Sequence, residues 1–272
     1  MDKIVVLKYG GNAMTDEKIK DQLINNICLL KERGFKMVII HGGGPFIEQT
    51  LKQVGIHSEF IDGQRKTSEH ALGYIEMVLK GKINGSLVAM LNAKGQKAVG
   101  LSGKDGKLII AKKRYHLNKK NNEIQPIDLG QVGEVDYIHT EILDILLNNN
   151  FLPVITCIAA DENGNGFNIN ADNFAGHIAG ALHAHEFILM TDVDGLMRNL
   201  EDPNSLITKI NLNEVSQLIE KEIIQGGMIP KLEACKTALK GGATSARIIN
   251  GTKPSKLLNI FQGQSEGTEI FK

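Results

Sequence analysis

Two glycine clusters, each directly after a short apolar run, constrain the fold of this chain more than any other feature. Gly10-Gly11 follows a run over residues 3–9, and Gly42-Gly43-Gly44 follows a run over residues 37–41. The β-branched content of both runs predicts buried strands. Pro45, directly after the second cluster, suits the first turn of a helix. Each cluster is therefore expected to join the carboxyl end of a strand to the amino end of a helix.

Short apolar runs continue to alternate with longer amphipathic segments toward the C-terminus. The further predicted strands are residues 98–101, 107–111, 152–157, 186–190 and 245–249, and the predicted helices are residues 16–33, 45–54, 68–92, 171–184, 212–222 and 231–240. Strands that alternate with helices form βαβ units. We therefore predict an α/β sandwich around a mainly parallel sheet.

The 272 residues contain no proline- or serine-rich linker and no internal repeat. Tethered domains are usually separated by such a linker, so we expect a single domain over residues 1–272. Within it we place an N-lobe over residues 1–184 and a C-lobe over residues 185–272, on one continuous sheet.

Composition excludes several classes of partner. Lys plus Arg and Asp plus Glu both total 31, so the chain lacks the positive charge of a dedicated nucleic-acid-binding protein. It shows no secretory signal pattern and no apolar run near the roughly 18 residues of a membrane span. We expect a cytoplasmic protein that binds neither nucleic acid nor a membrane. The three separated cysteines, Cys28, Cys157 and Cys235, are expected to be reduced core thiols.

The commonest phosphate-binding signatures are missing. No G-x-x-x-x-G-K-[ST] occurs, and neither glycine cluster completes G-x-G-x-x-G. We interpret Gly103-Lys104 as part of a hairpin turn between the strands at 98–101 and 107–111. No zinc motif occurs, so no metal ligand is assigned. The two glycine clusters predict an anion site instead, because bare amides at a helix start attract anions at the carboxyl edge of an α/β sheet.

Three cations are candidates for this site, each with a structural alternative. Lys8 ends an apolar strand, where a buried ammonium needs an anion nearby. Lys231 follows Pro230 at the start of a predicted helix, where it either meets a bound anion or is solvated. Arg65, in a turn before a helix, either binds a carboxylate bidentately or lies on the surface.

Two polar segments are also candidates. In Asn168-Ile169-Asn170-Ala171-Asp172, Asn170 suits a helix N-cap and Asp172 a first-turn acid, and both could equally belong to a site. The segment from Thr191 to Gly195 follows a predicted strand, and it is compatible with a plain turn, a metal site or a nucleotide loop. Spacing alone does not separate these alternatives.

Taken in order, these motifs resemble the amino acid kinase family over nearly the whole chain. They are K-x-G-G from Lys8, H-G-G-G-P from His41, G-x-R-x-T from Gly63, N-x-N-A-D from Asn168, T-D-V-x-G from Thr191 and G-G-M-x-x-K from Gly226. The resemblance implies an open three-layer αβα sandwich with substrate in the N-lobe and ATP in the C-lobe. It further implies phosphorylation of the γ-carboxylate of N-acetyl-L-glutamate by ATP with Mg²⁺, the second step of arginine biosynthesis.

Carried over position by position, the resemblance implies a role for each motif residue. Lys8 and Lys231 would be the transition-state cations, and Asp172 would position them. The amides of Gly11 and Gly44 would contact the transferred phosphoryl group. The implied substrate site consists of Gly43, Gly44, Arg65, Asn168 and Asn170. The implied nucleotide site consists of Lys8, Gly10, Gly11, Thr191, Asp192, Val193, Asp194, Gly195, Leu196, Ile223, Ile224, Gln225 and Lys231, with Mg²⁺ held mainly by the nucleotide phosphates.

Three alternative functions stay open. Carbamate kinase shares the start Gly10-Gly11-Asn12-Ala13, although N-x-N-A-D and G-x-R-x-T favour acetylglutamate. A kinase acting on carrier-bound aminoadipate would dock its acidic carrier on the basic residues 112–114, 119 and 120, which are equally typical of a solvated hairpin. A non-catalytic amino-acid sensor is disfavoured because the charged motif residues are all present.

The resemblance also suggests an assembly. Arginine-inhibited members of the family carry an extra N-terminal helix that joins dimers into a hexamer. Here only Met1 and Asp2 precede the first predicted strand. We therefore expect a homodimer without strong inhibition by arginine.

Overall fold

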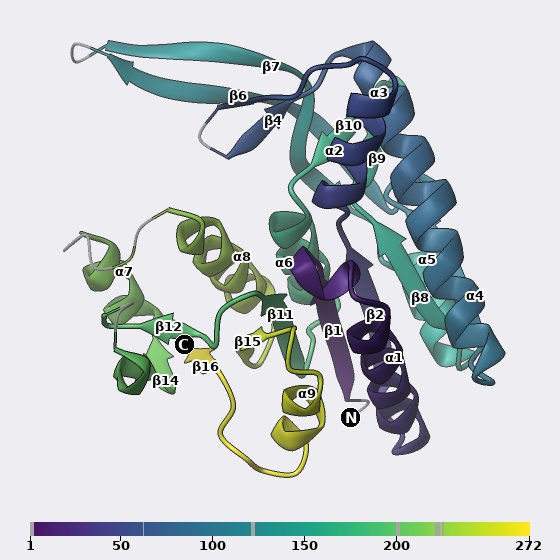
Figure 1. Ribbon diagram of the computed structural model, residues 1–272, viewed down its shortest axis with the longest axis vertical. Coiled ribbons are helices and arrows are strands. Elements are labelled where there is room, and N and C mark those ends of the chain that lie inside the picture. The colour runs from purple at the N-terminus through teal and green to yellow at the C-terminus, as the bar shows by residue number, and fades with distance from the viewer. Residues whose placement is uncertain (1–2, 62, 121–122, 200–201, 221–223, 225) are drawn as a thin grey trace.

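A computed structural model describes residues 3–61, 63–120, 123–199, 202–220, 224 and 226–272 (Figure 1). Within these residues the largest sheet has eight strands. Their spatial order is β14 (Lys209–Asn211), β16 (Thr268–Phe271), β15 (Ala246–Asn250), β11 (Glu186–Thr191), β1 (Ile4–Tyr9), β2 (Lys36–His41), β8 (Leu152–Thr156) and β5 (Ala98–Ser102). Only β16 against β15 is antiparallel. The predicted mainly parallel sheet is confirmed.

The strand order reverses beside β1. The chain passes from β1 to β2 on one side and later returns to place β11 on the other side of β1. In open α/β sheets such a reversal leaves a crevice at the carboxyl ends of the strands, where ligands bind. Both glycine clusters, which follow β1 and β2, lie at this edge.

Helices cover both faces of the sheet, as expected for three layers. Helices α1 (Glu17–Glu32) and α9 (Ser255–Ile260) pack together on one face, and α6 (Ala171–Ala181) and α8 (Met228–Gly241) pack together on the other (Figure 1). The remaining longer helices are α2 (Gly44–Gln53), α3 (Glu69–Glu76), the π-helix η2 (Met77–Asn84), α4 (Gly85–Ala93), α5 (Glu141–Asn148) and α7 (Leu212–Glu220). None of the helices built from the described residues is both long and apolar enough to cross a membrane.

A second, smaller sheet lies at one end of the molecule and closes into a four-stranded barrel. Its strands are β6 (Ile109–Lys120), β7 (Glu123–Ile138), β9 (Ile158–Ala160) and β10 (Gly166–Ile169). The long β6–β7 hairpin projects away from the body, with the short hairpin of β3 (Glu59–Ile61) and β4 (Gln64–Lys66) beside it (Figure 1). A last small pair, β12 (Leu196–Met197) and β13 (Leu206–Ile207), lies in the C-terminal half.

The predicted hairpin turn at Gly103-Lys104 is wrong. Strand β5 pairs with β8 in the large sheet, whereas β6 pairs with β7 in the second sheet. The turn is held by Asp105, whose carboxylate accepts hydrogen bonds from the backbone N–H and the hydroxyl of Ser102 at 2.6 and 2.8 Å. Gly103 N–H donates to Ile158 O at 2.6 Å. These contacts carry the chain from one sheet into the other, which the local pattern did not indicate.

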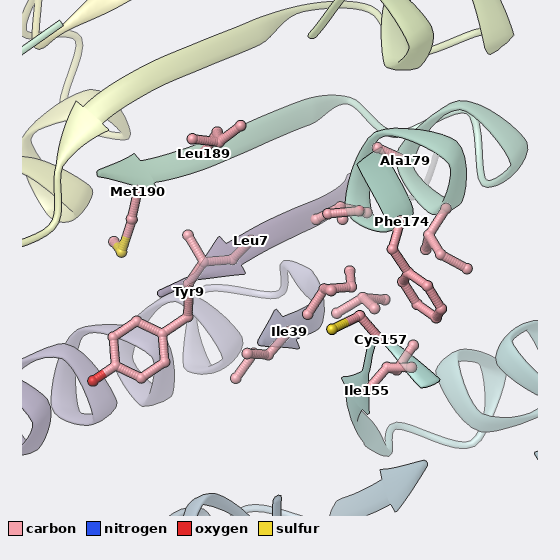
Figure 2. Close-up of a cluster of buried hydrophobic side chains, with 14 of the residues drawn as sticks. Leu7, Tyr9, Ile39, Ile155, Cys157, Phe174, Ala179, Leu189 and Met190 are labelled. Atoms are coloured by element: carbon pink, nitrogen blue, oxygen red, sulfur yellow. The ribbon is translucent and has the colours of Figure 1, made fainter. Parts of the chain in front are cut away.

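The core lies between the large sheet and its helices. Leu7, Ile39, Ile155 and Leu189, from four neighbouring strands, are buried together with Phe174 of α6 (Figure 2). Burial of this apolar surface supplies most of the stabilisation of such a sandwich. All three cysteines are buried and unpaired by disulfides, which confirms the prediction of core thiols.

Candidate active site

A cavity of about 320 Å³ opens at the carboxyl ends of β1 and β2, facing the second sheet. Its walls come from segments that are far apart in the sequence. They include most of the residues predicted above for catalysis and substrate binding, namely Lys8, Gly11, Gly43, Gly44, Arg65, Asn168, Asn170 and Asp172, and also Gly10, which was predicted for the nucleotide. The structure therefore places residues of four of the six motifs around one space.

Lys8, Asp172 and Lys231 form the charged centre of the site. Lys8 Nζ lies 2.7 Å from Asp172 Oδ1, and Lys231 Nζ donates a hydrogen bond to Asp172 Oδ2 at 2.9 Å. Asp172 is 5% exposed and Lys8 is 8% exposed. Two cations thus share one buried carboxylate, and the group keeps a net positive charge that an anionic ligand can balance.

Burial alone would raise the pKa of Asp172. The charges of Lys8 and Lys231 and their hydrogen bonds outweigh this effect, so the pKa of Asp172 lies below its usual value. The carboxylate is therefore ionised at neutral pH. It holds the two ammonium groups in place and does not act as an acid.

Close packing of α6 against α8 brings Lys231 to Asp172. Gly176 lies one turn after Asp172 on α6, and a Cβ at that position would lie 2.4 Å from Ala234 O. A Cβ on Gly180, one turn further along α6, would lie 2.9 Å from Gly241 Cα. Residues spaced by four share one helix face, so these glycines let α8 approach along the face that carries Asp172.

The first glycine turn brings backbone next to charged side chains. A Cβ on Gly10 would lie 2.6 Å from Lys8 Nζ, and a Cβ on Gly11 would lie 2.7 Å from Asp192 Oδ1. Gly11 also has φ +71°, a conformation that residues other than glycine rarely adopt. Glycine is therefore strongly favoured at position 11, between the ends of β1 and β11.

The second glycine turn starts α2, as predicted from Pro45. Gly43 is the N-cap residue, and no side chain caps the helix. A Cβ on Gly43 would lie 2.3 Å from Ile83 Cδ1, which belongs to the π-helix η2. The first amides of α2 are therefore available at the cavity, where a helix start favours an anion.

A buried histidine holds this turn. His41 Nδ1 lies 2.9 Å from Gly42 O, and Asn84 Nδ2 lies 3.0 Å from His41 Nε2 and 2.9 Å from Val154 O. Carbonyl oxygens only accept hydrogen bonds, so we infer that Nδ1 carries the proton and that Nε2 accepts from Asn84. Burial lowers the pKa of His41 to about 4, which keeps the ring neutral.

Arg65 lies on strand β4, not in the turn that its sequence neighbours suggested, because residues 64–66 pair with β3. Its guanidinium contacts Glu48 Oε2 at 2.7 Å and the hydroxyl of Ser58, and it lies over the ring of Phe60 at 4.5 Å. The hydrogen bond from Arg65 lowers the pKa of Glu48. Three partners thus orient the arginine that lines the cavity.

The asparagines of the N-x-N-A-D motif come from two elements. Asn168 belongs to β10. Asn170 is the N-cap of α6, where its Oδ1 accepts from the amides of Asp172 and Asn173 at 3.0 and 3.1 Å. The N-cap prediction for Asn170 and the first-turn prediction for Asp172 are confirmed. Both asparagines also line the cavity.

The segment predicted for the nucleotide lies after β11, outside the lining of this cavity. Thr191 ends the strand, Asp192 lies beside Gly11, and Val193 is exposed. Asp194 contacts Lys253 and Lys256 at 2.9 and 3.0 Å. The hydrogen bond from Lys253 is the main reason that the pKa of Asp194 falls to about 2.

The next predicted nucleotide residues pack against the sheet. A Cβ on Gly195 would lie 2.6 Å from Thr268 Oγ1, which accepts a hydrogen bond from Leu196 N–H at 2.7 Å. Ile224 is buried. Ile223 and Gln225 lie outside the described residues.

Several residues that line the cavity were not predicted for this site. They are Ile47, Phe60, Leu79, Arg114, Val132, Gly133 and Cys157. Most are apolar or sit on strands of the second sheet, so no local motif marks them. Burial raises the pKa of the Cys157 thiol to about 12, and it therefore stays protonated.

Known proteins resemble this chain over nearly its whole length. The model of the Amino acid kinase family matches residues 3–250. An acetylglutamate kinase from Methanococcus aeolicus is 48% identical over 270 residues, covering 99% of this chain and 92% of the relative. One from Methanocaldococcus jannaschii is 48% identical over 271 residues, covering 98% of this chain and 90% of the relative.

A solved structure shows the same fold. N-acetylglutamate synthase from Neisseria gonorrhoeae, complexed with coenzyme A and N-acetyl-glutamate, superposes with a TM-score of 0.83 at 22% identity. The match covers 99% of this chain and 59% of the synthase, so this chain corresponds to part of that longer protein. At this identity the likeness concerns the fold alone.

Proposed function

Because the chain belongs to the amino acid kinase family, we propose that it transfers the γ-phosphoryl group of ATP to the γ-carboxylate of N-acetyl-L-glutamate. The reaction yields N-acetyl-L-glutamyl 5-phosphate and ADP and is a step of arginine biosynthesis. The observation that carries the proposal is the convergence of Lys8 and Lys231 on Asp172 beside two glycine turns. This arrangement supplies positive charge and amide donors at one point.

The reacting carboxylate needs no general base. A γ-carboxyl group has a pKa of about 4.3 and is ionised at neutral pH. The barrier is electrostatic, because the carboxylate and the phosphates repel each other and charge moves to the leaving oxygen. Lys8 and Lys231 offset this charge on the two sides of the transferred group, and the amides of Gly11 and Gly44 donate to its oxygens. Asp172 holds both lysines.

The acceptor is bound by the opposite wall of the cavity. Arg65 pairs with the α-carboxylate of N-acetyl-L-glutamate, since a guanidinium fits a carboxylate bidentately. Asn168 and Asn170 donate amide hydrogen bonds, and Gly43 and Gly44 line the same end. The contacts of Arg65 with Glu48 and Phe60 support this role, because they fix the guanidinium before the substrate binds.

ATP binds on the side of the C-lobe. Residues 191–196 and 223–225 border the nucleotide, and Lys8, Gly10, Gly11 and Lys231 contact its phosphates. The position of Asp192 next to Gly11 supports this placement, because it joins the segment after β11 to the phosphoryl end. Mg²⁺ neutralises phosphate charge when it is bound, and we expect the nucleotide phosphates to hold it.

The remaining expectations also belong to this proposal. The chain works as a single domain with an N-lobe over residues 1–184 for the acceptor and dimer contacts, and a C-lobe over residues 185–272 for ATP. It forms a homodimer in the cytoplasm without strong arginine inhibition. Light scattering that gives a hexamer, or half-inhibition at low arginine concentration, would contradict the assembly proposed.

The test is ATP- and Mg²⁺-dependent formation of an acyl phosphate, trapped as the hydroxamate. The acceptors to compare are N-acetyl-L-glutamate, L-glutamate and N-acetyl-L-aminoadipate, with ADP release measured for carbamate. We expect a strong preference for N-acetyl-L-glutamate. Lys231→Ala and Lys8→Ala should each lower kcat about 10²-fold or more, the usual loss for one electrostatic contact to a transition state.

The matched control is Lys236→Ala, on the same helix as Lys231. Lys236 is more exposed and pairs with Glu233 at 3.6 Å, away from the cavity, so this variant should keep its turnover. Activity with a different acceptor only would leave the phosphoryl end in place and reassign the wall around Arg65. Tight ligand binding without turnover of any acceptor would identify a sensor instead of a kinase.

A further inference from the structure

Arg114, on β6, belongs to a basic run that looks uniform in the sequence. Strand β7 neutralises its neighbours, since Lys112 Nζ lies 3.0 Å from Asp136 and Lys113 Nζ lies 2.8 Å from Asp128. Arg114 lines the cavity instead, and its guanidinium makes no ion pair or hydrogen bond within the described part of the chain. The run thus contains two lysines that form ion pairs with carboxylates of β7 and one arginine that lines the cavity.

An irregularity between β6 and β7 accounts for this difference. Lys113 pairs with Gly133 and Tyr115 pairs with Asp128, so Arg114 alone stands opposite residues 129–132 of β7. Bulges bend a strand and redirect a side chain, and they are common next to active sites. With regular pairing, Arg114 would lie in the β6–β7 ladder together with Lys112 and Lys113.

The same segment of β7 is hydrogen-bonded to Thr67, which follows the β3–β4 hairpin that contains Arg65. Thr67 N–H donates to Leu129 O at 2.9 Å, and Gln131 N–H donates to Thr67 O at 2.6 Å. A Cβ on Gly130 would lie 2.2 Å from Thr67 O, so this approach requires glycine. Arg65 and Arg114 therefore come from two strands that flank one short stretch of β7.

The other cations that line the cavity already have anionic partners. Lys8 contacts Asp172, and Arg65 contacts Glu48, each at 2.7 Å. Within the described residues, Arg114 is the lining cation that lacks a partner. A ligand with two carboxylates would find one cation group at the phosphoryl end and an unneutralised guanidinium at the other wall.

Carboxylates near Arg114 are engaged elsewhere. Arg114 also lines a neighbouring cavity with Glu134 and Glu233. Glu134 lies 3.6 Å from the ammonium of Lys112, and Glu233 lies 3.6 Å from that of Lys236. Neither forms an ion pair with Arg114, so the guanidinium remains available to a ligand.

We propose that Arg114 is a second binding residue for the α-carboxylate of the acyl amino acid, opposite Arg65. The proposal rests on the proposed function and deepens it. The carboxylate is favoured over a phosphate because Arg114 and Arg65 are both attached to β7, whereas Lys8, Gly11 and the other phosphoryl contacts come from the central sheet. Two guanidiniums on one carboxylate make the site select substrates with a free α-carboxylate.

The test compares Arg114→Gln and Arg114→Lys with the matched control Lys113→Gln on the adjacent strand position. Steady-state kinetics and calorimetric binding are measured with N-acetyl-L-glutamate and with its α-amide, which lacks the charge in question. Arg114→Gln should raise KM and Kd for N-acetyl-L-glutamate about 10- to 100-fold, the value of one hydrogen bond to a charged group. KM for ATP should stay unchanged.

The other variants sharpen this result. Arg114→Lys should recover part of the lost affinity, because it keeps the charge but not the bidentate fork. Lys113→Gln should match wild type. With the α-amide, wild type and Arg114→Gln should bind equally, since the group that Arg114 recognises is gone.

Three results would overturn the proposal. They are unchanged affinity in Arg114→Gln, an equal penalty with the α-amide, and a rise in KM for ATP alone, which would assign Arg114 to the phosphates. Failure of the proposed function looks different, because wild type itself would then leave N-acetyl-L-glutamate unphosphorylated. The two outcomes are therefore distinguished by the wild-type assay.

Discussion

Replacing Asp172 by asparagine isolates the role of its charge. The side chains have nearly the same shape, so the packing at the first turn of α6 is kept. Lys8 Nζ and Lys231 Nζ lie 2.7 and 2.9 Å from the two carboxylate oxygens. In Asp172→Asn both ammonium groups face a neutral amide, and no anion separates them.

The cost can be worked from these distances. The two ammonium groups are at most about 8 Å apart, so their repulsion is at least about 2 kcal/mol at an effective dielectric constant of about 20. The attraction to the carboxylate is lost as well, and removing one member of a buried ion pair costs about 3 to 5 kcal/mol. We expect the free energy of unfolding to fall by about that amount.

Catalysis and nucleotide binding should respond in opposite directions. Without Asp172 the lysines are no longer held in place, and kcat should fall about 10²- to 10³-fold. The site gains positive charge, so Asp172→Asn should bind ATP at least as tightly as wild type. Urea unfolding, the hydroxamate assay and ATP calorimetry measure the three quantities.

Asp161→Asn is the control for this substitution. Asp161 is a loop carboxylate that accepts hydrogen bonds from the amides of Asn163 and Asn165, remote from the cavity lining. The kcat and the ATP affinity of Asp161→Asn should equal those of wild type. Wild-type kcat in Asp172→Asn, or ATP binding weakened in parallel with kcat, would refute the reasoning that Asp172 positions the two lysines.

Two further substitutions test the glycine turns. Gly11→Ala combines a positive φ with a Cβ 2.7 Å from Asp192 Oδ1. Chemical denaturation should therefore show a decrease of more than about 1 kcal/mol in the free energy of unfolding, and turnover should fall. The control Gly34→Ala has φ +86° and open space around it, so it should show only the effect of backbone strain. His41 has a folded pKa of about 4 and an ordinary value of 6.5. Between pH 6.5 and pH 4 the unfolded chain therefore binds a proton at His41 that the folded chain does not bind. The free energy of unfolding should decrease by about 3 kcal/mol as the pH drops from 6.5 to 4. Urea unfolding from pH 4 to pH 7.5 should show this slope in wild type and a shallower one in His41→Gln; equal slopes would contradict the assignment.

The end of the cavity that we propose for the phosphoryl group was predictable because its signals are local. The Gly10-Gly11 and Gly42–Gly44 clusters lie between a strand and a helix in the sequence, and the sheet then places both at its carboxyl edge. Asn170 and Asp172 are likewise read from one helix start. In each case the chemistry follows from neighbours within a few residues.

The wall that we propose for the acceptor was less predictable because tertiary contacts form it. The pairing of Arg65 with Glu48 joins a hairpin to α2, and nothing near Arg65 in the sequence marks Glu48 as its partner. Arg114 sits in a run of three basic residues, and only the bulge against β7 separates it from the lysines. Much of the long β6–β7 hairpin is also exposed, so its strands lack an apolar alternation.

The cavity has two walls that come from different sheets. The end proposed for the phosphoryl group is built on the central sheet and on helices that start there, whereas Arg65 and Arg114 lie on hairpins joined through Thr67 and β7. We therefore expect mutations in these hairpins to change the acceptor and to leave the residues proposed for phosphoryl transfer intact. An engineered change of acceptor specificity would therefore involve both hairpins together, because hydrogen bonds at Thr67 link them.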